Sequence, residues 1–182
     1  MRKTIGFSVV FFLTVAALLL AFVWSGSSGN NTSDSNENAA SVSVTPRPDC
    51  AFDTLAGVTL DCLGGEVTPT GDNAQRTVVS LWAWWCEPCR TELPFFDELA
   101  ARHPELTVIG VHQDPDSARG AALLDDLGVQ MASLSDPNNQ LSPRLNLPNV
   151  VPITLVFAAD GELERFYAIP FESYEELEAT VQ

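Results

Sequence analysis

Two cysteines separated by two residues stand out in the stretch "SLWAWWCEPCRTELPFF", which begins at Ser80. The pair is Cys86 and Cys89, with Glu87 between them and Glu92 three residues further on. Thiols at this spacing can close a disulfide. In thiol–disulfide exchange one thiolate attacks a substrate disulfide and a second thiol resolves the mixed disulfide. The pattern therefore indicates redox chemistry at this pair.

The flanking residues place the pair where a buried strand ends and a helix begins. Residues 76–83 are rich in β-branched residues and apolar on both faces, which is typical of a strand covered by helices. Residues 88–103 carry apolar side chains at helical spacing. Pro88 suits the first turn because it has no N–H to leave unpaired, and Pro94 is expected to kink the helix.

This position assigns different roles to the two cysteines. Cys86 faces the free N–H groups at the start of the helix, and their positive dipole end favours its thiolate. Cys89 lies one turn inside the helix and is expected to be shielded. We therefore predict that an exposed Cys86 attacks and that Cys89 resolves.

The rest of the chain alternates strands and helices. The pattern predicts one α/β domain, in which a βαβ unit is followed by an antiparallel hairpin and a closing helix. The expected elements are a strand at 106–112, a helix capped by Asp114 or Asp116 and ending at Gly128, a segment of uncertain type at 131–134, a short helix at 137–145, strands at 153–157 and 162–168, and a helix from Ser173.

Three other uses of such a pair have sequence requirements of their own. Zinc sites built on C-x-x-C need a second closely spaced pair, but eleven residues separate Cys50 from Cys62. Covalent haem needs a histidine after the second cysteine, where Arg90 stands. A purely structural disulfide suits an oxidising compartment, but an exposed pair at a helix start is a poor position for one. No metal site and no cofactor beyond a Cys86–Cys89 redox disulfide are expected.

With these residues in view, the stretch "VVSLWAWWCEPCRTELPFF" resembles the active-site region of thioredoxin-like proteins, in particular the membrane-anchored extracytoplasmic branch of TlpA/ResA type. The stretch "NVVPITLVFAADGELERFYAI" resembles that family's second landmark. The resemblance implies a thioredoxin-like fold, a central mixed sheet flanked by helices. It also implies that Pro152 is a cis proline beside the disulfide, that Val151 presents its backbone to an extended substrate, and that Glu92 is an active-site glutamate.

Two departures from the family concern proton handling. Cytoplasmic thioredoxins bury an aspartate where this chain has Ser80. Their partner lysine has no counterpart, because Lys3 is the only lysine in the chain. Glu92 is then the nearest proton-exchanging candidate. From the residues alone it would be an ordinary solvated helix acid.

Aromatic and flanking residues around the thiols suggest a docking surface. Trp84 and Trp85, together with Glu87, Pro88 and Val151, are the candidates for contact with a protein substrate. Trp82 is expected in the core. His103 and His112 have no second histidine at ligand spacing, and we predict ordinary structural roles for them.

The first 48 residues differ in composition from the rest. Arg2 and Lys3 precede an uncharged run of 20 residues from Ile5 to Trp24. Residues 1–24 therefore predict a signal anchor, with a cleaved signal peptide as the alternative. Residues 25–48 are rich in Ser, Asn and Gly and predict a disordered linker. Residues 49–182 would then form a single domain outside the cytoplasm, either membrane-anchored or secreted after cleavage.

Charge and cysteine count restrict the partners. The segment 49–182 holds 22 of the 24 acidic residues and six arginines, so a nucleic-acid partner is not expected. In an exported chain an even number of cysteines favours a second, structural disulfide, between Cys50 and Cys62.

The favoured function is an extracytoplasmic thiol–disulfide oxidoreductase, in particular a protein-disulfide reductase. Its substrates would be protein thiols and disulfides, and the resemblance adds cytochrome c maturation. A reductase would also need a membrane electron donor. The acidic Glu87 beside Cys86 favours that direction over an oxidase. Two alternatives are a thiol peroxidase, whose Pro-x-x-x-Thr-x-x-Cys pattern is broken by Val79 and Ala83, and a non-catalytic binding or sensor domain.

Overall fold

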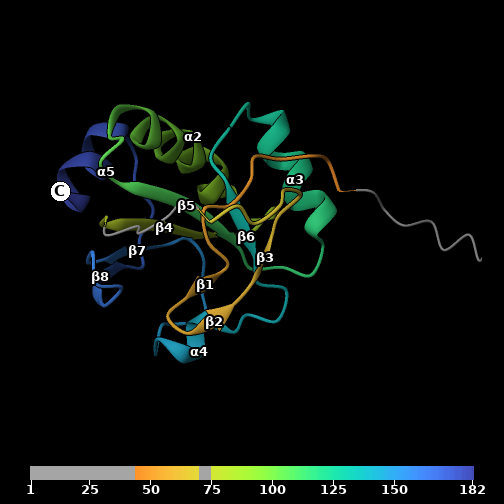
Figure 1. The fold of residues 1–182 in the computed structure, drawn as a ribbon. Coiled ribbons are helices and arrows are strands. Elements are labelled where there is room, and N and C mark those ends of the chain that lie inside the picture. Colours follow the sequence, from red (N-terminus) through yellow and green to blue (C-terminus); the bar gives the residue numbers. More distant parts are fainter. Residues whose placement is uncertain (1–43, 70–74) are drawn as a thin grey trace, which may run out of the picture. The chain divides into compact units, whose positions relative to one another are not determined.

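The structure, a computed structural model, describes residues 44–69 and 75–182 (Figure 1). Its centre is a six-stranded mixed sheet in the order β3-β6-β5-β4-β7-β8. A separate two-stranded hairpin, β1–β2, precedes it. The strands are β1 (Thr54–Leu55), β2 (Val58–Thr59), β3 (Asp61–Cys62), β4 (Thr77–Trp82), β5 (Thr107–His112), β6 (Ser133–Ser135), β7 (Ile153–Phe157) and β8 (Leu163–Tyr167). The helices are α2 (Glu87–Arg102), α3 (Ser117–Asp126), α4 (Leu141–Arg144) and α5 (Tyr174–Val181).

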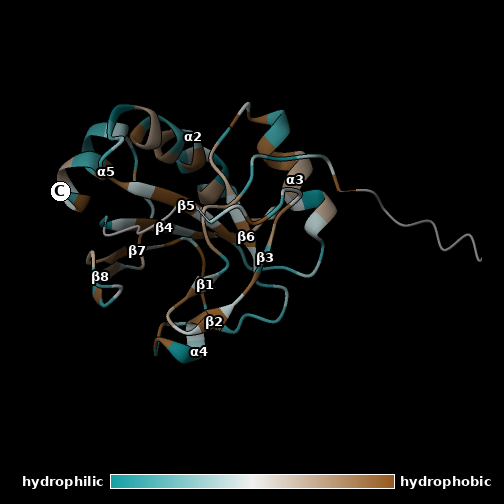
Figure 2. Cartoon of the chain, in the orientation of Figure 1, coloured by the Kyte–Doolittle hydropathy of each residue, from teal (hydrophilic) through white to brown (hydrophobic). Residues whose placement is uncertain are grey.

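The sheet is covered on both faces, as the two-sided apolar strands predict. Along β4, Val78 and Trp82 pack into one core with side chains of α2, α3 and α5. Val79 and Leu81 point the other way, into a core shared with α4 and the β1–β2 hairpin. Figure 2 shows the hydrophobic colour concentrated on the central strands. The predicted fold class, a mixed sheet flanked by helices, is confirmed.

Helix α2 supplies most of one face through a continuous buried stripe. Its buried residues, Cys89, Glu92, Leu93, Phe96 and Leu99, follow the three- and four-residue spacing of one helix face. Each large apolar side chain buried this way contributes roughly 1.5–3 kcal/mol. The helix continues through Pro94 to Arg102. Its apolar stripe up to Leu99 packs in one core with Val78 and Trp82 of β4.

Several expected elements form with ends shifted by one residue, including β4, α2, β5 and β8. The segment of uncertain type becomes β6, which pairs in parallel with β5 and antiparallel with β3. The helix expected at 137–145 is wrong in length, because only Leu141–Arg144 is helical. The residues before Leu141 are held in another way: the side chain of Asp136 accepts from the N–H groups of Gln140 at 2.8 Å and Leu141 at 3.0 Å. These bonds hold the backbone just before α4, whose N-cap is Gln140.

The N-terminal part of the described chain packs against the domain. The N–H of Arg47 donates to the carbonyl of Gly64 at 2.9 Å, and its guanidinium donates to the carbonyl of Val129. A Cβ on Gly65 would lie 2.5 Å from the carbonyl oxygen of Pro48, so only glycine permits this approach. Residues 44–48 therefore belong with the domain and not with the linker predicted over 25–48.

The predicted anchor at 1–24 and the rest of the predicted linker lie outside the described residues. Within 44–69 and 75–182 no helix is long and apolar enough to cross a bilayer.

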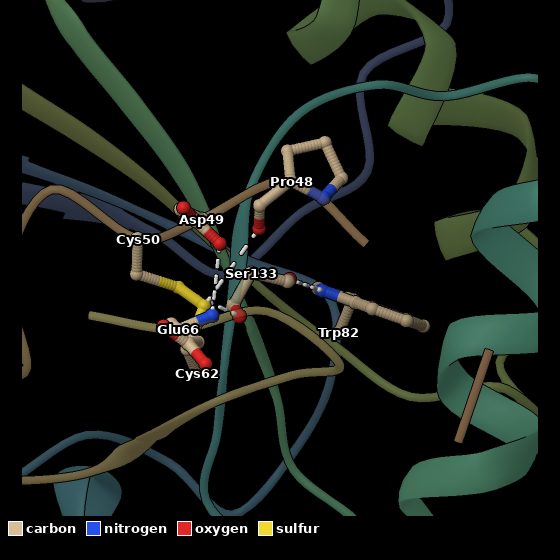
Figure 3. Close-up of a disulfide and its surroundings, with 7 residues drawn as sticks. All are labelled: Pro48, Asp49, Cys50, Cys62, Glu66, Trp82 and Ser133. Atoms are coloured by element: carbon tan, nitrogen blue, oxygen red, sulfur yellow. Dashed lines mark hydrogen bonds between the residues drawn. A yellow bond between two sulfur atoms is a disulfide. The ribbon is translucent and has the colours of Figure 1, made fainter. Parts of the chain in front are cut away.

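The predicted Cys50–Cys62 disulfide is present (Figure 3). It joins the N-terminal segment to β3, with an S–S distance of 2.05 Å. Cys50 is fully buried, and its sulfur lies 3.3 Å from the carbonyl oxygen of Ser133 on β6. Because the two cysteines are twelve positions apart in the sequence, this bond restricts the unfolded chain more than a bond between near neighbours does.

We expect removal of this bond to destabilise the domain by about 3 kcal/mol, the entropy of closing a loop of this size. The test compares urea unfolding of Cys86→Ser/Cys89→Ser with a variant that also carries Cys50→Ala/Cys62→Ala. Dithiothreitol should lower the midpoint of the first protein to that of the second and leave the second unchanged. Equal midpoints without reductant would show that the bond contributes nothing to stability.

Candidate active site

The candidate site lies at one end of the central strands, where four chain segments meet. Strands β4 and β5 are parallel, so residues 83–89 and 113–116 leave the sheet at the same end of these strands. Strand β7 is antiparallel to β4, with Leu81 opposite Ile153. The start of β7 therefore lies beside the end of β4. The segments before β7 and after β6 lie at the same end. This is the carboxyl end of the parallel strands, where α/β sheets place their ligand sites.

Cys86 and Cys89 form the predicted disulfide, with an S–S distance of 2.00 Å. Cys86 is the N-cap of α2, and its sulfur accepts from the backbone N–H of Cys89 at 3.3 Å. Cys89 is fully buried, as predicted, but Cys86 is only 4% exposed. The expectation of an openly exposed Cys86 is therefore wrong for the oxidised form, because Trp84 and Val151 pack against the same cluster.

The peptide bond between Val151 and Pro152 is cis, as the resemblance implied. Pro152 is buried and Val151 is half-buried. Pro152 directly precedes Ile153, which pairs with Leu81 of β4. The sheet register therefore places the cis proline at the same end of the strands as the segment that leads to Cys86.

The three tryptophans have separate environments. Trp82 is in the core, as predicted, and its indole N–H donates to the hydroxyl of Ser133 at 3.0 Å. Trp84 and Trp85 both donate to the carboxylate of Asp114, at 3.2 and 2.9 Å. The guanidinium carbon of Arg119 lies 4.4 Å from the ring centre of Trp84, so Arg119 covers one face of this ring. Trp85, 56% exposed, is the stronger docking candidate of the pair.

Glu92 is fully buried on the stripe of α2 that also holds Cys89. One carboxylate oxygen, Oε2, accepts from the N–H of Phe171 at 3.1 Å. Among the described residues Oε1 has no partner. Burial raises the pKa of Glu92 from 4.5 to about 7, and the bond from Phe171 works in the opposite direction. An ordinary solvated helix acid is excluded by this burial. The spacing of Glu92 from Cys89 and Phe96 is the sequence signal that could have revealed it.

Other buried polar groups lie near the same strands. His112, at the end of β5, is fully buried with its ring centre 4.6 Å from that of Trp82. Burial lowers the pKa of His112 to about 4, so the ring is neutral near pH 7. The sequence missed this burial. Ser80, at the place of the thioredoxin aspartate, is buried opposite Thr154, and neither hydroxyl has a partner among the described residues.

His103 has the structural role predicted for it. Its two ring nitrogens lie 2.8 Å from carboxylate oxygens of Glu105 and Glu178, and this contact links the end of α2 to α5. These hydrogen bonds, with Glu178 first, raise the pKa of His103. Within the described ranges no group of three metal-ligating side chains comes together.

Comparison with known proteins agrees with this geometry. Residues 52–166 match the sequence model of the AhpC/TSA family. The chain belongs to this family. It is 24% identical over 89 residues to the thiol-disulfide oxidoreductase ResA of Oceanobacillus iheyensis, a match that covers 48% of this chain and 46% of ResA. It is 32% identical over 112 residues to the thiol:disulfide interchange protein DsbE homologue of Paracoccus denitrificans, covering 59% of this chain and 60% of the relative.

Among solved structures, the chain is similar to a secreted Mycobacterium tuberculosis disulfide oxidoreductase homologous to E. coli DsbE. The TM-score is 0.59 at 24% identity, covering 69% of this chain and 95% of that structure. This likeness shows the fold, which is thioredoxin-like. The curated relatives are matched over only about half of their length, 46% for ResA and 60% for the DsbE homologue.

The buried carboxyl of Glu92 links pH to stability. Because its pKa is higher in the folded domain, at about 7, than the ordinary 4.5, the folded state holds this proton more tightly. Stability from this group is full below about pH 4.5 and is lost as pH rises through about 7. Glutamine cannot ionise, so Glu92→Gln should gain stability over wild type as pH rises, by on the order of 3 kcal/mol at pH 8.

Urea unfolding between pH 4 and 8 measures this difference. Glu98→Gln on the same helix is the matched control, because Glu98 is half-buried and pairs with Arg102. It should show no such gain. A constant difference between Glu92→Gln and wild type across this range would contradict the buried, proton-holding carboxyl.

Proposed function

We propose that this chain is an extracytoplasmic thiol–disulfide oxidoreductase that acts by dithiol exchange at Cys86 and Cys89. The observation that carries the proposal is the Cys86–Cys89 disulfide at the start of α2, which lies at the same end of the central strands as the cis bond before Pro152. The similarity to relatives named for thiol–disulfide chemistry supports it.

The exchange runs in two steps. In the reduced chain the Cys86 thiolate attacks one sulfur of a substrate disulfide, forms a mixed disulfide and releases the first substrate thiolate. The Cys89 thiolate then attacks Cys86 Sγ, releases the second substrate thiolate and closes the Cys86–Cys89 disulfide. Two electrons pass to the substrate, whose thiolates take up protons. The N–H of Cys89, which donates to Cys86 Sγ, favours the thiolate needed for attack.

Reduction of protein disulfides is the favoured direction. The exposed carboxylate of Glu87 next to Cys86 opposes thiolate formation, and a less stable thiolate makes a better reductant. A reductase outside the cytoplasm needs electrons from a membrane donor. Apocytochrome c is the substrate that the resemblance suggests. We propose that Trp85, Pro88 and Val151 receive the substrate together with Glu87, whereas Trp84 offers less surface under Arg119.

We also propose that residues 1–24 hold the domain outside the cytoplasm as an uncleaved anchor. The basic residues before an uncharged run of 20 support this orientation. The N-terminal residue of the mature protein distinguishes the anchored form from a secreted one.

The cysteine roles can be tested directly. Cys86→Ser should reduce exchange with a protein disulfide to background, because the attacking sulfur is lost. Cys89→Ser should accumulate a mixed disulfide with substrate, detectable by mass spectrometry. Peroxide consumption is measured in parallel. Activity in Cys86→Ser would overturn the roles, peroxide turnover without disulfide exchange would indicate a thiol peroxidase, and neither activity a non-catalytic domain.

Glu92 is proposed to exchange a proton with Cys89, one helical turn away. When ionised, its buried carboxylate disfavours the neighbouring thiolate. Glu92→Gln should therefore lower the apparent thiol pKa values and move the pH profile of exchange to lower pH. The shift belongs to the coupled group and not to one thiol. Single-turnover rates from pH 5 to 10 measure it, and a profile identical to that of Glu98→Gln would leave Glu92 without this role.

A further inference from the structure

A small cavity lies among the segments that follow β4 and β5 and precede β7. Its volume is about 160 Å³, and it is lined by Trp85, Gln113, Asn139, Asn149, Val150 and Val151. Two of these residues are next to the reacting groups, because Trp85 precedes Cys86 and Val151 precedes the cis Pro152. A substrate whose cysteine reaches Cys86 would bring its neighbouring residues to this cavity.

Three carboxamides in the cavity wall are joined in a hydrogen-bonded ladder. Gln113 Nε2 donates to Asn139 Oδ1 at 2.7 Å and to Ser142 Oγ at 3.1 Å. Asn139 Nδ2 donates to Asn149 Oδ1 at 2.6 Å. Gln113 Oε1 at one end and Asn149 Nδ2 at the other bond no described residue. The ladder therefore ends in one acceptor and one donor.

This pairing of ends does not depend on how the amide oxygens and nitrogens are assigned. If all three amides are turned over, Asn149 offers the acceptor and Gln113 the donor. In both arrangements the two ends offer one acceptor and one donor, the types that pair with an N–H and with a carbonyl. A carboxamide is such a group, whether in an Asn or Gln side chain or in a peptide bond.

The fold holds the ladder in place before any ligand arrives. Asn139, its middle member, has a φ of +50°, a conformation that asparagine tolerates better than most residues. Its N–H donates to the carbonyl of Asp136 at 3.1 Å, and the buried Asp136 side chain accepts from the N–H of Gln140 at 2.8 Å. Asp114 accepts from the indole of Trp85, another lining residue, and so fixes it. A preorganised wall costs less to order on binding.

Size and charge narrow the ligand. Pockets for small molecules usually measure about 300–1,000 Å³, so 160 Å³ suits one side chain or one peptide unit. The chain has a net charge of −15, yet every residue lining this cavity is uncharged. The cavity is therefore suited to a neutral polar group with the apolar contacts of Trp85, Val150 and Val151.

We propose that this cavity is a specificity subsite that binds a carboxamide of the protein substrate next to its reactive cysteine, through Gln113, Asn139 and Asn149. The proposal rests on the proposed thiol–disulfide exchange. Gln113, Asn139 and Val151 are half-buried, whereas Trp85, Asn149 and Val150 are exposed. An apolar or charged isostere forfeits the hydrogen bonds that an amide makes with the ladder ends, so the site discriminates in favour of the amide.

The test uses disulfide-linked dimers of Ac-Ala-X-Cys-X-Ala-amide, where X is Gln, Met or Glu. The prereduced full-length chain is mixed with each peptide, and its single-turnover oxidation is followed by tryptophan fluorescence. We expect the Gln peptide to react about tenfold faster than the Met and Glu peptides. In Asn139→Gly, where glycine accepts the positive φ, this ratio should fall below about twofold.

Asn146→Gly is the matched control, because Asn146 also has a positive φ, +53°, but does not line the cavity. It should retain the tenfold ratio. The three peptides could instead react at equal rates that exceed the rate with 2-hydroxyethyl disulfide. If Asn139→Gly slows these reactions and Asn146→Gly does not, the ladder binds an amide of the peptide backbone. Rates insensitive to both X and Asn139→Gly would overturn the subsite alone. Failure to react even with 2-hydroxyethyl disulfide would overturn the proposed function and the subsite with it.

Discussion

The register of β4 against its two neighbours is the constraint on which the site depends. Parallel pairing with β5 and antiparallel pairing with β7 bring the end of β4 to the end of one neighbour and the start of the other. The cysteines, the cis proline and the segment that starts at Gln113 therefore meet without any long loop. A shift of one residue in either pairing would turn alternate side chains to the opposite face and separate these groups. The two cores that clamp β4 from both sides make such a shift costly.

The interior of the domain also holds polar groups that a purely structural core would avoid. Glu92 Oε1, both ring nitrogens of His112, and the hydroxyls of Ser80 and Thr154 have no partner among the described residues. Leaving a buried polar group unpaired costs about 1–3 kcal/mol. For Glu92 the cost has a chemical consequence, since a pKa of about 7 keeps the carboxyl able to gain or lose a proton near neutral pH. His112, with a pKa of about 4, stays neutral and adds no positive charge to the site.

Local patterns predicted much of this arrangement, and long-range contacts account for what they missed. The start of α2 at the cysteines followed from an apolar strand, a proline and a helical stripe, and the cysteine count predicted the Cys50–Cys62 bond. The cis bond before Pro152 came from the family resemblance. The burial of Glu92 depends on Phe171, 79 residues away. The amide ladder joins residues from three separate segments, and the packing of residues 44–48 depends on glycines at 64 and 65. Apart from the helical spacing of Glu92, these contacts leave no periodic signal in the sequence.

The two disulfides differ in position because they act on different parts of the chain. Cys86 and Cys89 are three residues apart at a helix start, so opening that bond leaves the backbone on both sides held by α2 and β4. The Cys50–Cys62 bond instead ties the N-terminal segment to β3 at the far edge of the sheet. Ser133 connects that edge to the site, since its carbonyl contacts Cys50 Sγ while its hydroxyl accepts from Trp82, the last residue of β4 (Figure 3). The buried bond thus braces the strand that leads to Cys86 and Cys89, so the exchange proposed for this pair would proceed on a fixed support.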